Sequence, residues 1–407
     1  MKFSKLSRLF LVSMIGLAVA SLLTACQIVT IDYVFVASSQ GSGSSSAGQI
    51  QTYDADSQTG ALRIGQPAVP SGGSNPVSMA VSSDFANLYV ANAGNSSVVH
   101  FSLDGNGVLK QKDTVTASST PVSIAVNAAI TYLYVVSGTT SATLTAYPLS
   151  SGTIGAASQA PLTVPGYAGD TIVPTAVTVL ANNNAVYIAA YDQSAYNPGC
   201  TPVATCITST ANPGWIFGFT VGSGGALTQA AGSPWKAGIK PSALAADPTS
   251  RFLYATDFAS NELIGYTIQS GSVLNFLING PFKTGNEPSA IAIDPRGKYI
   301  YVSNSLDSAV SSYTIDLATG TPSGIFSTTG GQSNATDTQP VAIVVDSALA
   351  RFVYTANHLG DSVSGFEMNT DTGAISPTQA TPYPAGASPT ALASVPHGNH
   401  ALQVTTP

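Results

Sequence analysis

One arrangement of apolar and polar positions recurs along the chain. Each copy begins with proline, continues into an apolar-Ala-apolar run, and after a turn gives an apolar-Tyr-apolar run that ends on small or polar residues. Short alternating runs between turn residues are typical of β-strands. The opening prolines lie roughly 45 to 65 residues apart, a spacing typical of one repeated structural unit. They are Pro76, Pro121, Pro174, Pro241, Pro288, Pro340 and Pro389.

Two further features recur in step with the prolines. The second run of each unit is centred on a tyrosine, with Val34-Phe35-Val36 as an N-terminal version, and the tyrosines are Tyr89, Tyr134, Tyr187, Tyr254, Tyr301 and Tyr354. A glycine then marks the next hairpin, because glycine readily adopts the positive φ that tight turns require. These hairpin glycines include Gly60, Gly107, Gly152, Gly225, Gly271, Gly320 and Gly373. Each unit is therefore predicted to hold three or four strands.

The two ends of the chain complement each other. The first unit, from Ile31 to Gly73, lacks the opening Pro-x-x-apolar-Ala strand, whereas the segment after Pro389 supplies one and little more. If these segments share one blade, a ring closes without exposed sheet edges. The sequence therefore predicts an all-β fold, a single seven-bladed β-propeller over residues 31–407 whose N- and C-terminal segments form one blade.

The first 25 residues differ from the rest. A basic stretch precedes an apolar run from Leu9 to Leu23, and small residues lead into Cys26. This pattern resembles a bacterial lipoprotein signal peptide (residues 1–25), with Cys26 lipidated and residues 26–30 as a tether; an uncleaved anchor or a plain secretory signal are alternatives. We therefore expect an exported lipoprotein anchored to a membrane of a bacterial cell envelope, in the periplasm or at the outer membrane or cell surface.

Composition narrows the possible partners. Only 8% of residues are charged, and the formal net charge is −7, so the basic surface that nucleic acid requires is not expected. Cys200 and Cys206 are the two cysteines after the leader, and in an exported chain they are predicted to form a disulfide. The histidines show no zinc spacing with them, so no metal and no cofactor is predicted. Because the ring closes on itself, we expect a monomer.

The repeats also resemble a known family. Leu88-Tyr89-Val90-Ala91-Asn92 and Ile300-Tyr301-Val302-Ser303-Asn304, each followed by a paired apolar run and a Gly hairpin, are similar to YVTN-type β-propellers and to the seven-bladed lactonase family. That family, also called the cycloisomerase-2 family, includes bacterial 6-phosphogluconolactonases. The resemblance covers essentially everything after the leader and implies lactone hydrolysis at the channel mouth. Where the family resembles Pro-His-x-His and Pro-Arg-His, however, this chain has Pro241-Ser242-Ala243-Leu244 and Pro288-Ser289-Ala290.

In such a propeller, the loops after the second strand and those before the opening proline share one face. Carboxylates and an imidazole on this face could activate water against an ester carbonyl, and the catalytic candidates are Asp257, Glu262 and His358. Candidates for ligand contacts are Asn92, Lys240, Glu287, Asn304, Asp307, Asn357 and Asp361. The alternative is that the asparagines cap turns and that the charged residues are solvated loop tips.

One loop, residues 191–215, is roughly twenty residues longer than its counterparts, and loops of this length are often functional. It contains Tyr196 and Trp215, aromatic residues that could stack on a saccharide or on a partner protein. The sequence thus supports two functions. The first is a cell-envelope platform that binds a saccharide, a small lactone or an envelope protein; the alternative is a lactonase-like hydrolase that opens a sugar-derived lactone. Whether the protein is an enzyme stays open at this point.

Overall fold

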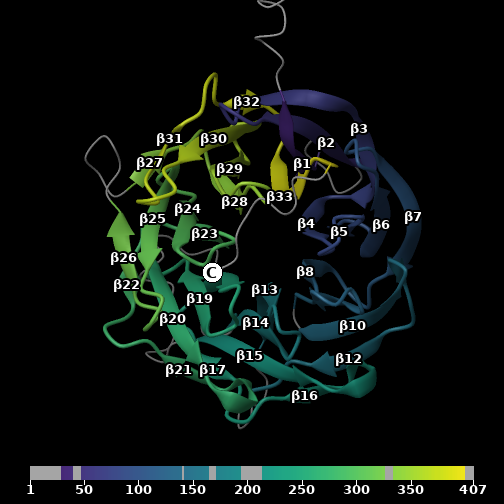
Figure 1. The fold of residues 1–407 in the computed structure, drawn as a ribbon. Helices are drawn as coiled ribbons and strands as arrows, with labels where there is room; N and C mark the ends of the chain where they lie inside the picture. Colours follow the sequence, from purple (N-terminus) through teal and green to yellow (C-terminus); the bar gives the residue numbers. More distant parts are fainter. Residues whose placement is uncertain are drawn as a thin grey trace, which may run out of the picture.

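The computed structural model describes residues 29–39, 47–139, 142–164, 171–193, 213–325 and 333–398. Its regular structure is almost entirely β, with seven antiparallel sheets. Figure 1 shows the sheets arranged in a ring. The prediction of a seven-bladed β-propeller is therefore confirmed. Among these residues, no helix has the length and apolar character needed to cross a membrane.

The blades follow the repeats, with the opening proline at or near the start of the innermost strand. Blade 1 contains β1 (Thr30–Ser38), β2 (Ala47–Asp56), β3 (Leu62–Ser74) and β33 (Pro389–Pro396). Blade 2 contains β4 (Pro76–Val81), β5 (Asn87–Asn92), β6 (Ser97–Leu103) and β7 (Leu109–Thr116). Blade 3 contains β8 (Pro121–Val126), β9 (Tyr132–Ser137), β10 (Thr143–Ser150), β11 (Thr153–Ile154) and β12 (Ser158–Pro161).

In the remaining blades, the fourth strand is also split into two short pieces. Blade 4 contains β13 (Ile172–Val179), β14 (Ala185–Asp192), β15 (Gly214–Val221), β16 (Leu227–Gln229) and β17 (Trp235–Lys236). Blade 5 contains β18 (Pro241–Ala246), β19 (Phe252–Asp257), β20 (Glu262–Ile268), β21 (Leu274–Phe276) and β22 (Phe282–Lys283). Blade 6 contains β23 (Pro288–Ile293), β24 (Tyr299–Asn304), β25 (Ala309–Ile315), β26 (Pro322–Ile325) and β27 (Ser333–Ala335). Blade 7 contains β28 (Pro340–Val345), β29 (Phe352–Asn357), β30 (Ser362–Met368), β31 (Ile375–Pro377) and β32 (Tyr383–Pro384).

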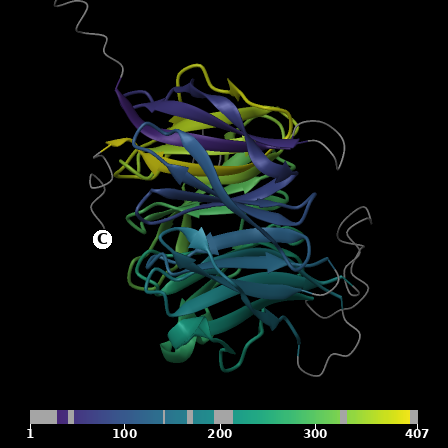
Figure 2. The same cartoon turned by 90° about the vertical axis from the view of Figure 1, so that its right-hand side faces the viewer.

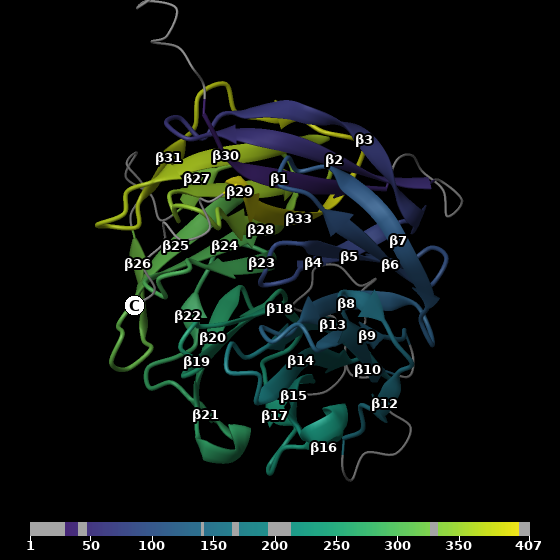
Figure 3. The ribbon, with the colours of Figure 1, turned by 45° about the vertical axis from the view of Figure 1, so that its right-hand side comes forward.

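Blade 1 joins the two ends of the described chain. Its sheet order is β3-β2-β1-β33, so the last strand of the chain is the innermost strand of the first blade. The register pairs Val34 with Ser394 and Val36 with Leu392. In Figures 1 and 3, the yellow β33 lies beside the purple β1. The shared blade predicted from the sequence is therefore present, and the ring has no open sheet edge at this junction.

The repeated tyrosine connects neighbouring blades. The hydroxyl of Tyr354 in blade 7 donates to the carbonyl oxygen of Gly60 in blade 1 at 2.9 Å. The same bond joins Tyr89 to Gly152, Tyr254 to Gly320, and Tyr301 to Gly373. Burial raises the pKa of Tyr354 well above its usual value, so the hydroxyl remains a donor. The recurrence of tyrosine and glycine in the sequence thus reflects a hydrogen bond between blades.

The hairpin glycine also packs closely against the preceding blade. Gly60 has a φ of 64°, and a Cβ atom built on it would lie 2.3 Å from Cδ1 of Phe352. Phe352 is fully buried, two residues before Tyr354 on β29. A side chain at position 60 would therefore meet both an unfavourable backbone conformation and a steric clash. Figure 2 shows the same ring of blades from the side.

Candidate functional site

The central channel opens between the innermost strands. A cavity of about 300 Å³ is lined by residues from the start of all seven of these strands, including Val77 of β4, Ser242 of β18 and Val341 of β28. The second strands run antiparallel to them, so in every blade except blade 4 the opening proline pairs with the last residue of the second strand, as Pro340 pairs with Asn357. The loops on both sides of this pair therefore surround the same mouth of the channel.

Three neighbouring blades place ionisable groups at this mouth. In every blade except blade 4, the residue before the opening proline accepts a backbone hydrogen bond from the residue after the second strand. In blade 5, Phe258 N donates to Lys240 O at 3.0 Å. The corresponding donor in blade 6 bonds Glu287 O at 2.9 Å, and His358 N in blade 7 donates to Gln339 O at 2.8 Å. Lys240, Glu287 and His358 thus occupy corresponding levels in consecutive blades.

A hydrogen bond to the next blade fixes the ring of His358. Its Nδ1 lies 3.1 Å from the carbonyl oxygen of Pro389, which can only accept a hydrogen bond. Nδ1 must therefore carry a proton, and in a neutral imidazole the lone pair then lies on Nε2. The side chain is half-buried. His358 consequently has the tautomer required of a base that acts through Nε2.

The same interaction is made by hydroxyl groups elsewhere in the ring. Ser242 Oγ donates to Pro288 O at 2.6 Å, and Ser289 Oγ donates to Pro340 O at 2.7 Å. Blade 7 has Val341 at the equivalent position, which has no hydroxyl. His358 supplies the bond to the next proline instead. The imidazole therefore replaces a repeated structural contact while its second nitrogen is left for chemistry.

Lys240 lies against two aromatic rings. Its Nζ is 4.2 Å from the ring centre of Phe258 and 5.8 Å from that of Tyr191. Burial lowers the pKa of Lys240, whereas the negative charges of Glu287 and Asp257 act in the opposite direction. A partly desolvated ammonium group interacts more strongly with an anion than an exposed one does. Lys240 could therefore stabilise negative charge that develops on a ligand.

Asp257, predicted as a catalytic residue, is fully buried. Its carboxylate accepts hydrogen bonds from the backbone N–H groups of Ile239 at 2.7 Å, Lys240 at 2.9 Å and Ala259 at 3.1 Å. These bonds hold the loop that carries Lys240. The structure thus places Asp257 beneath the mouth, where it positions Lys240.

The repeated asparagines, predicted as possible ligand contacts, are also fully buried. Asn92 bonds Ser71, with its Oδ1 accepting from Ser71 Oγ at 2.7 Å. Asn304 Nδ2 donates to Ser311 Oγ at 2.9 Å, and Asn357 Nδ2 donates to the hydroxyls of two serines of β30. Their side chains bond serines within or alongside the sheets, so these bonds are not the turn caps of the structural alternative.

Two carboxylates on the loop tips remain exposed. Asp307 accepts from Asn286 N at 2.6 Å and from Asn286 Nδ2 at 2.8 Å. Asp361 accepts from Ser388 N at 2.7 Å. Both therefore brace the loops before an opening proline while their solvent-facing side stays accessible.

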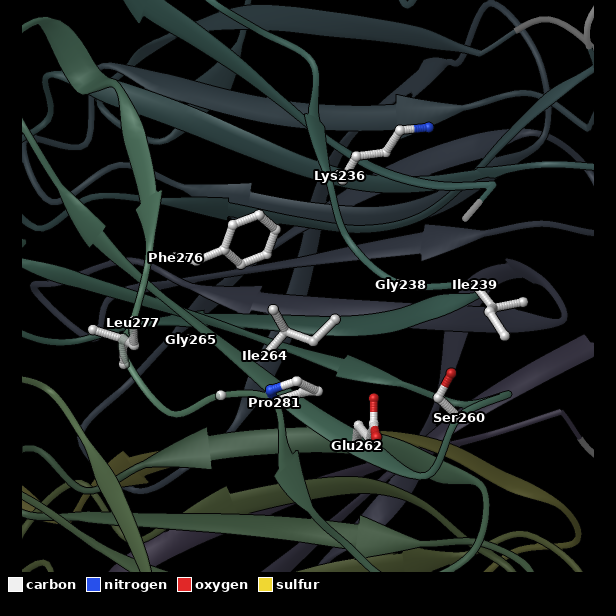
Figure 4. A pocket seen from close by; sticks show the side chains of 11 residues that line it. Lys236, Gly238, Ile239, Ser260, Glu262, Ile264, Gly265, Phe276, Leu277 and Pro281 are labelled. Carbon is white, nitrogen blue, oxygen red and sulfur yellow. The ribbon is translucent and has the colours of Figure 1, made fainter. Parts of the chain in front are cut away.

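Glu262 lies in a different hollow from His358. Its Oε1 forms an ion pair with Lys283 Nζ at 2.8 Å. It lines a pocket of about 220 Å³ between blades 4 and 5, together with Lys236, Ile264 and Phe276, as Figure 4 shows. Asp257 is buried beneath the mouth. The structure therefore does not gather Asp257, Glu262 and His358 into one catalytic group.

The long loop contributes only its ends to the described structure. Trp215 is buried at the start of β15, and Lys236 Nζ lies 3.6 Å from its ring centre. Tyr196, the predicted disulfide partners Cys200 and Cys206, and the predicted lipidation site Cys26 lie outside the described residues. Within the described ranges, no cluster of three or more His, Cys, Asp or Glu side chains could hold a metal ion.

Several mouth residues were not predicted from the sequence. Phe258, Ser305, Leu306 and Leu359 follow the second strands of blades 5, 6 and 7. Ser305 Oγ donates to Glu287 O at 3.0 Å, which holds the Glu287 backbone from the neighbouring loop. Their positions in the repeat could have indicated them, because each lies one or two residues after the Asp or Asn that ends the second strand. These residues surround the ionisable groups described above.

Comparison with solved structures identifies similar folds. The periplasmic gluconolactonase of Pseudomonas aeruginosa has a TM-score of 0.71 and 17% identity, covering 90% of this chain and 99% of that one. A putative 6-phosphogluconolactonase of Bacteroides fragilis has a TM-score of 0.68 and 17% identity, over 90% and 98%. A putative 6-phosphogluconolactonase from Bacteroides uniformis has a TM-score of 0.68 and 18% identity, covering 90% of this chain and 100% of that one. No curated protein matches the sequence.

The family comparison extends over most of the chain. The family described as Lactonase, 7-bladed beta-propeller, matches residues 33–171 and 243–402. The unmatched stretch between them contains the long loop, every strand of blade 4 and Lys240. The matched residues include the loops that carry Glu287 and His358. The chain therefore belongs to the lactonase family of seven-bladed β-propellers.

Proposed function

We propose that this protein is a lactonase that hydrolyses the ester bond of a lactone at the channel mouth. The observation that carries the proposal is the bond from His358 Nδ1 to Pro389 O, because it directs the basic lone pair of the neutral ring to Nε2. Membership of the lactonase family supports the same activity. The comparison proteins named as gluconolactonases support it at the level of the fold.

The reaction requires one base and one site for the oxyanion. His358 Nε2 takes a proton from water, and the hydroxide formed attacks the lactone carbonyl carbon. The carbonyl oxygen becomes an oxyanion, and we assign its stabilisation to the ammonium group of Lys240, which the loop before β18 carries at the same mouth. When the tetrahedral intermediate collapses, the bond from carbon to the ring oxygen breaks, and the leaving oxygen takes the proton back from His358. The product is a hydroxy acid.

Glu287 and Asp257 assist without touching the reacting atoms. Their negative charges favour the protonated form of Lys240 against the effect of burial. Asp257 also holds the backbone of Lys240 in place. Because the pKa of Lys240 is lowered from 10.5, we expect the rate to fall as pH rises through that lowered pKa, and replacement by methionine to remove this alkaline limb. The methionine variant should also be roughly 10²-fold slower, as after loss of an oxyanion donor.

The test is release of acid from lactones at constant pH. His358→Asn keeps an amide N–H near the position of Nδ1, so the bond to Pro389 can persist, but it removes the base. We expect the rate constant kcat to fall by about 10² to 10⁴ while the melting temperature stays near that of the wild type. The matched control is His397→Asn. His397 follows β33 at the end remote from Pro389 and should leave the rate unchanged. Wild-type rates in the His358 variant would overturn the proposal.

The binding-platform function has less support. Its proposed contacts, Tyr196 and most of the 191–215 loop, lie outside the described residues, whereas the family match supports the lactonase. We retain as a proposal that Cys26 is lipidated and that the protein works in the cell envelope. Incorporation of labelled fatty acid into the wild type, and its loss in Cys26→Ser, would test that location independently of activity.

A further inference from the structure

Two exposed leucines lie at the channel mouth. Leu306 and Leu359 are each 65% exposed, at equivalent positions in the loops after the second strands of blades 6 and 7. Leu359 directly follows His358. The corresponding residues in blades 2 and 5 are small, Gly94 and Ala259. Exposed leucines cost solvation free energy, and an apolar group bound over these two equivalent loop positions would reduce that cost.

The channel side of His358 is apolar as well. Val341 lines the cavity at the position where blades 4, 5 and 6 carry a hydroxyl residue. The imidazole of His358 therefore has Val341 of the channel on one side and the loop tips that carry Leu306 and Leu359 on the other. A ligand whose carbonyl group reaches His358 would place its neighbouring atoms against an apolar surface.

The positive charge at this site does not suit a phosphate group. In the described loops on the mouth side of the ring, the lysines are Lys236, Lys240 and Lys283, and all three are carried by blades 4 and 5. The arginines of blades 6 and 7 are at the opposite ends of the strands. Arg296 pairs there with Asp294 at 2.8 Å, and Arg351 pairs with Glu367. Phosphate recognition typically uses paired arginine or lysine donors, and the described parts of blades 6 and 7, which carry His358 and the two leucines, place none on the mouth side.

We propose that the substrate is an unphosphorylated lactone with an apolar substituent, which lies across Leu306 and Leu359 while the ring carbonyl faces His358. This inference rests on the proposed lactonase function and specifies its substrate class. Each methylene group buried against the leucines would contribute up to about 0.8 kcal/mol, which corresponds to about a fourfold gain in kcat/KM.

The test compares γ-lactones of increasing alkyl chain length, from γ-butyrolactone to γ-decanolactone, with glucono-δ-lactone and 6-phosphogluconolactone. For the wild type, we expect kcat/KM to rise about two- to fourfold per methylene until the leucines are covered. Leu306→Ser and Leu359→Ser should flatten this rise. The matched control is Leu317→Ser. Leu317 is also exposed, but it lies in the β25–β26 hairpin at the opposite end of blade 6, so the rise should persist.

The outcomes separate the two proposals. Hydrolysis that is independent of chain length, a preference for 6-phosphogluconolactone, or an unchanged chain-length dependence in both serine variants would overturn the substrate class. In those cases, loss of activity in His358→Asn would still support the lactonase. If no lactone in the panel is hydrolysed, the lactonase proposal itself fails, and the substrate class fails with it.

Discussion

The junction between blades 7 and 1 offers a direct test of how the ring is held closed. We predict that Gly60→Ala destabilises the protein more than Gly271→Ala. Both glycines lie in hairpins after the third strand and have left-handed φ values, 64° and 73°. They differ in their surroundings, because a Cβ at position 60 meets the buried Phe352 ring at 2.3 Å, whereas a Cβ at position 271 has nothing within 4 Å.

The magnitude follows from these two contributions. Alanine in the left-handed region costs about 1 to 2 kcal/mol, and this cost applies to both variants. Overpacking a rigid, buried neighbour costs a further 1 to 3 kcal/mol or so, and this applies only to Gly60. The smaller conformational freedom of alanine in the unfolded chain affects both variants equally and cancels in the comparison. The expected free energies of unfolding therefore fall by about 2 to 5 kcal/mol for Gly60→Ala and about 1 to 2 kcal/mol for Gly271→Ala.

Urea unfolding followed by circular dichroism measures both free energies. A double-mutant cycle with Phe352→Leu adds a specific check, because a smaller side chain at position 352 relieves the clash. The coupling between the two substitutions should then be favourable by at least about 0.5 kcal/mol. Equal destabilisation by the two glycine substitutions, or no coupling with Phe352, would refute the steric argument.

Three further predictions concern charged groups. Asp32 is fully buried, and burial together with the nearby Asp346 raises the pKa of its carboxyl group above 3.8. The stability that the protonated carboxyl group contributes is therefore complete below pH 3.8 and is lost as pH rises through the raised pKa. Asp32→Asn should therefore gain stability relative to the wild type between pH 4 and pH 8 in urea unfolding, and a parallel pH dependence would contradict this reasoning. Asp257→Asn places an amide N–H against backbone N–H donors, so it should lower the free energy of unfolding by about 1 to 3 kcal/mol. An unchanged midpoint of urea unfolding would show that these hydrogen bonds contribute little. The ion pair of Arg351 and Glu367 is partly exposed. The coupling free energy from a double-mutant cycle on this pair should therefore stay below about 1 kcal/mol and decrease as salt is added. A larger value that does not depend on salt would contradict this expectation.

Much of the candidate site followed from the repeat. Lys240, Glu287 and His358 stand out in the sequence as departures from a recurring pattern, and they do occupy the mouth. The repeat could not show that Asp257 and Glu262 would be separated from His358. Asp257 is bonded to backbone beneath the surface, and Glu262 is paired with Lys283 in another pocket. Partner choice among charged groups depends on which loops pack together, and local spacing does not encode that packing.

The sequence by itself determined the number of blades, the shared blade and the positions of the hairpins. Alternating apolar residues and turn residues act over a few neighbouring positions, so they can be recognised without the fold. Only the tertiary structure decided which contacts the repeated residues make with one another. The Tyr354 hydroxyl reaches Gly60 across the ring closure, and His358 replaces the hydroxyl that Val341 lacks. These contacts join residues distant in the chain, and they form only when the closed ring brings neighbouring blades together.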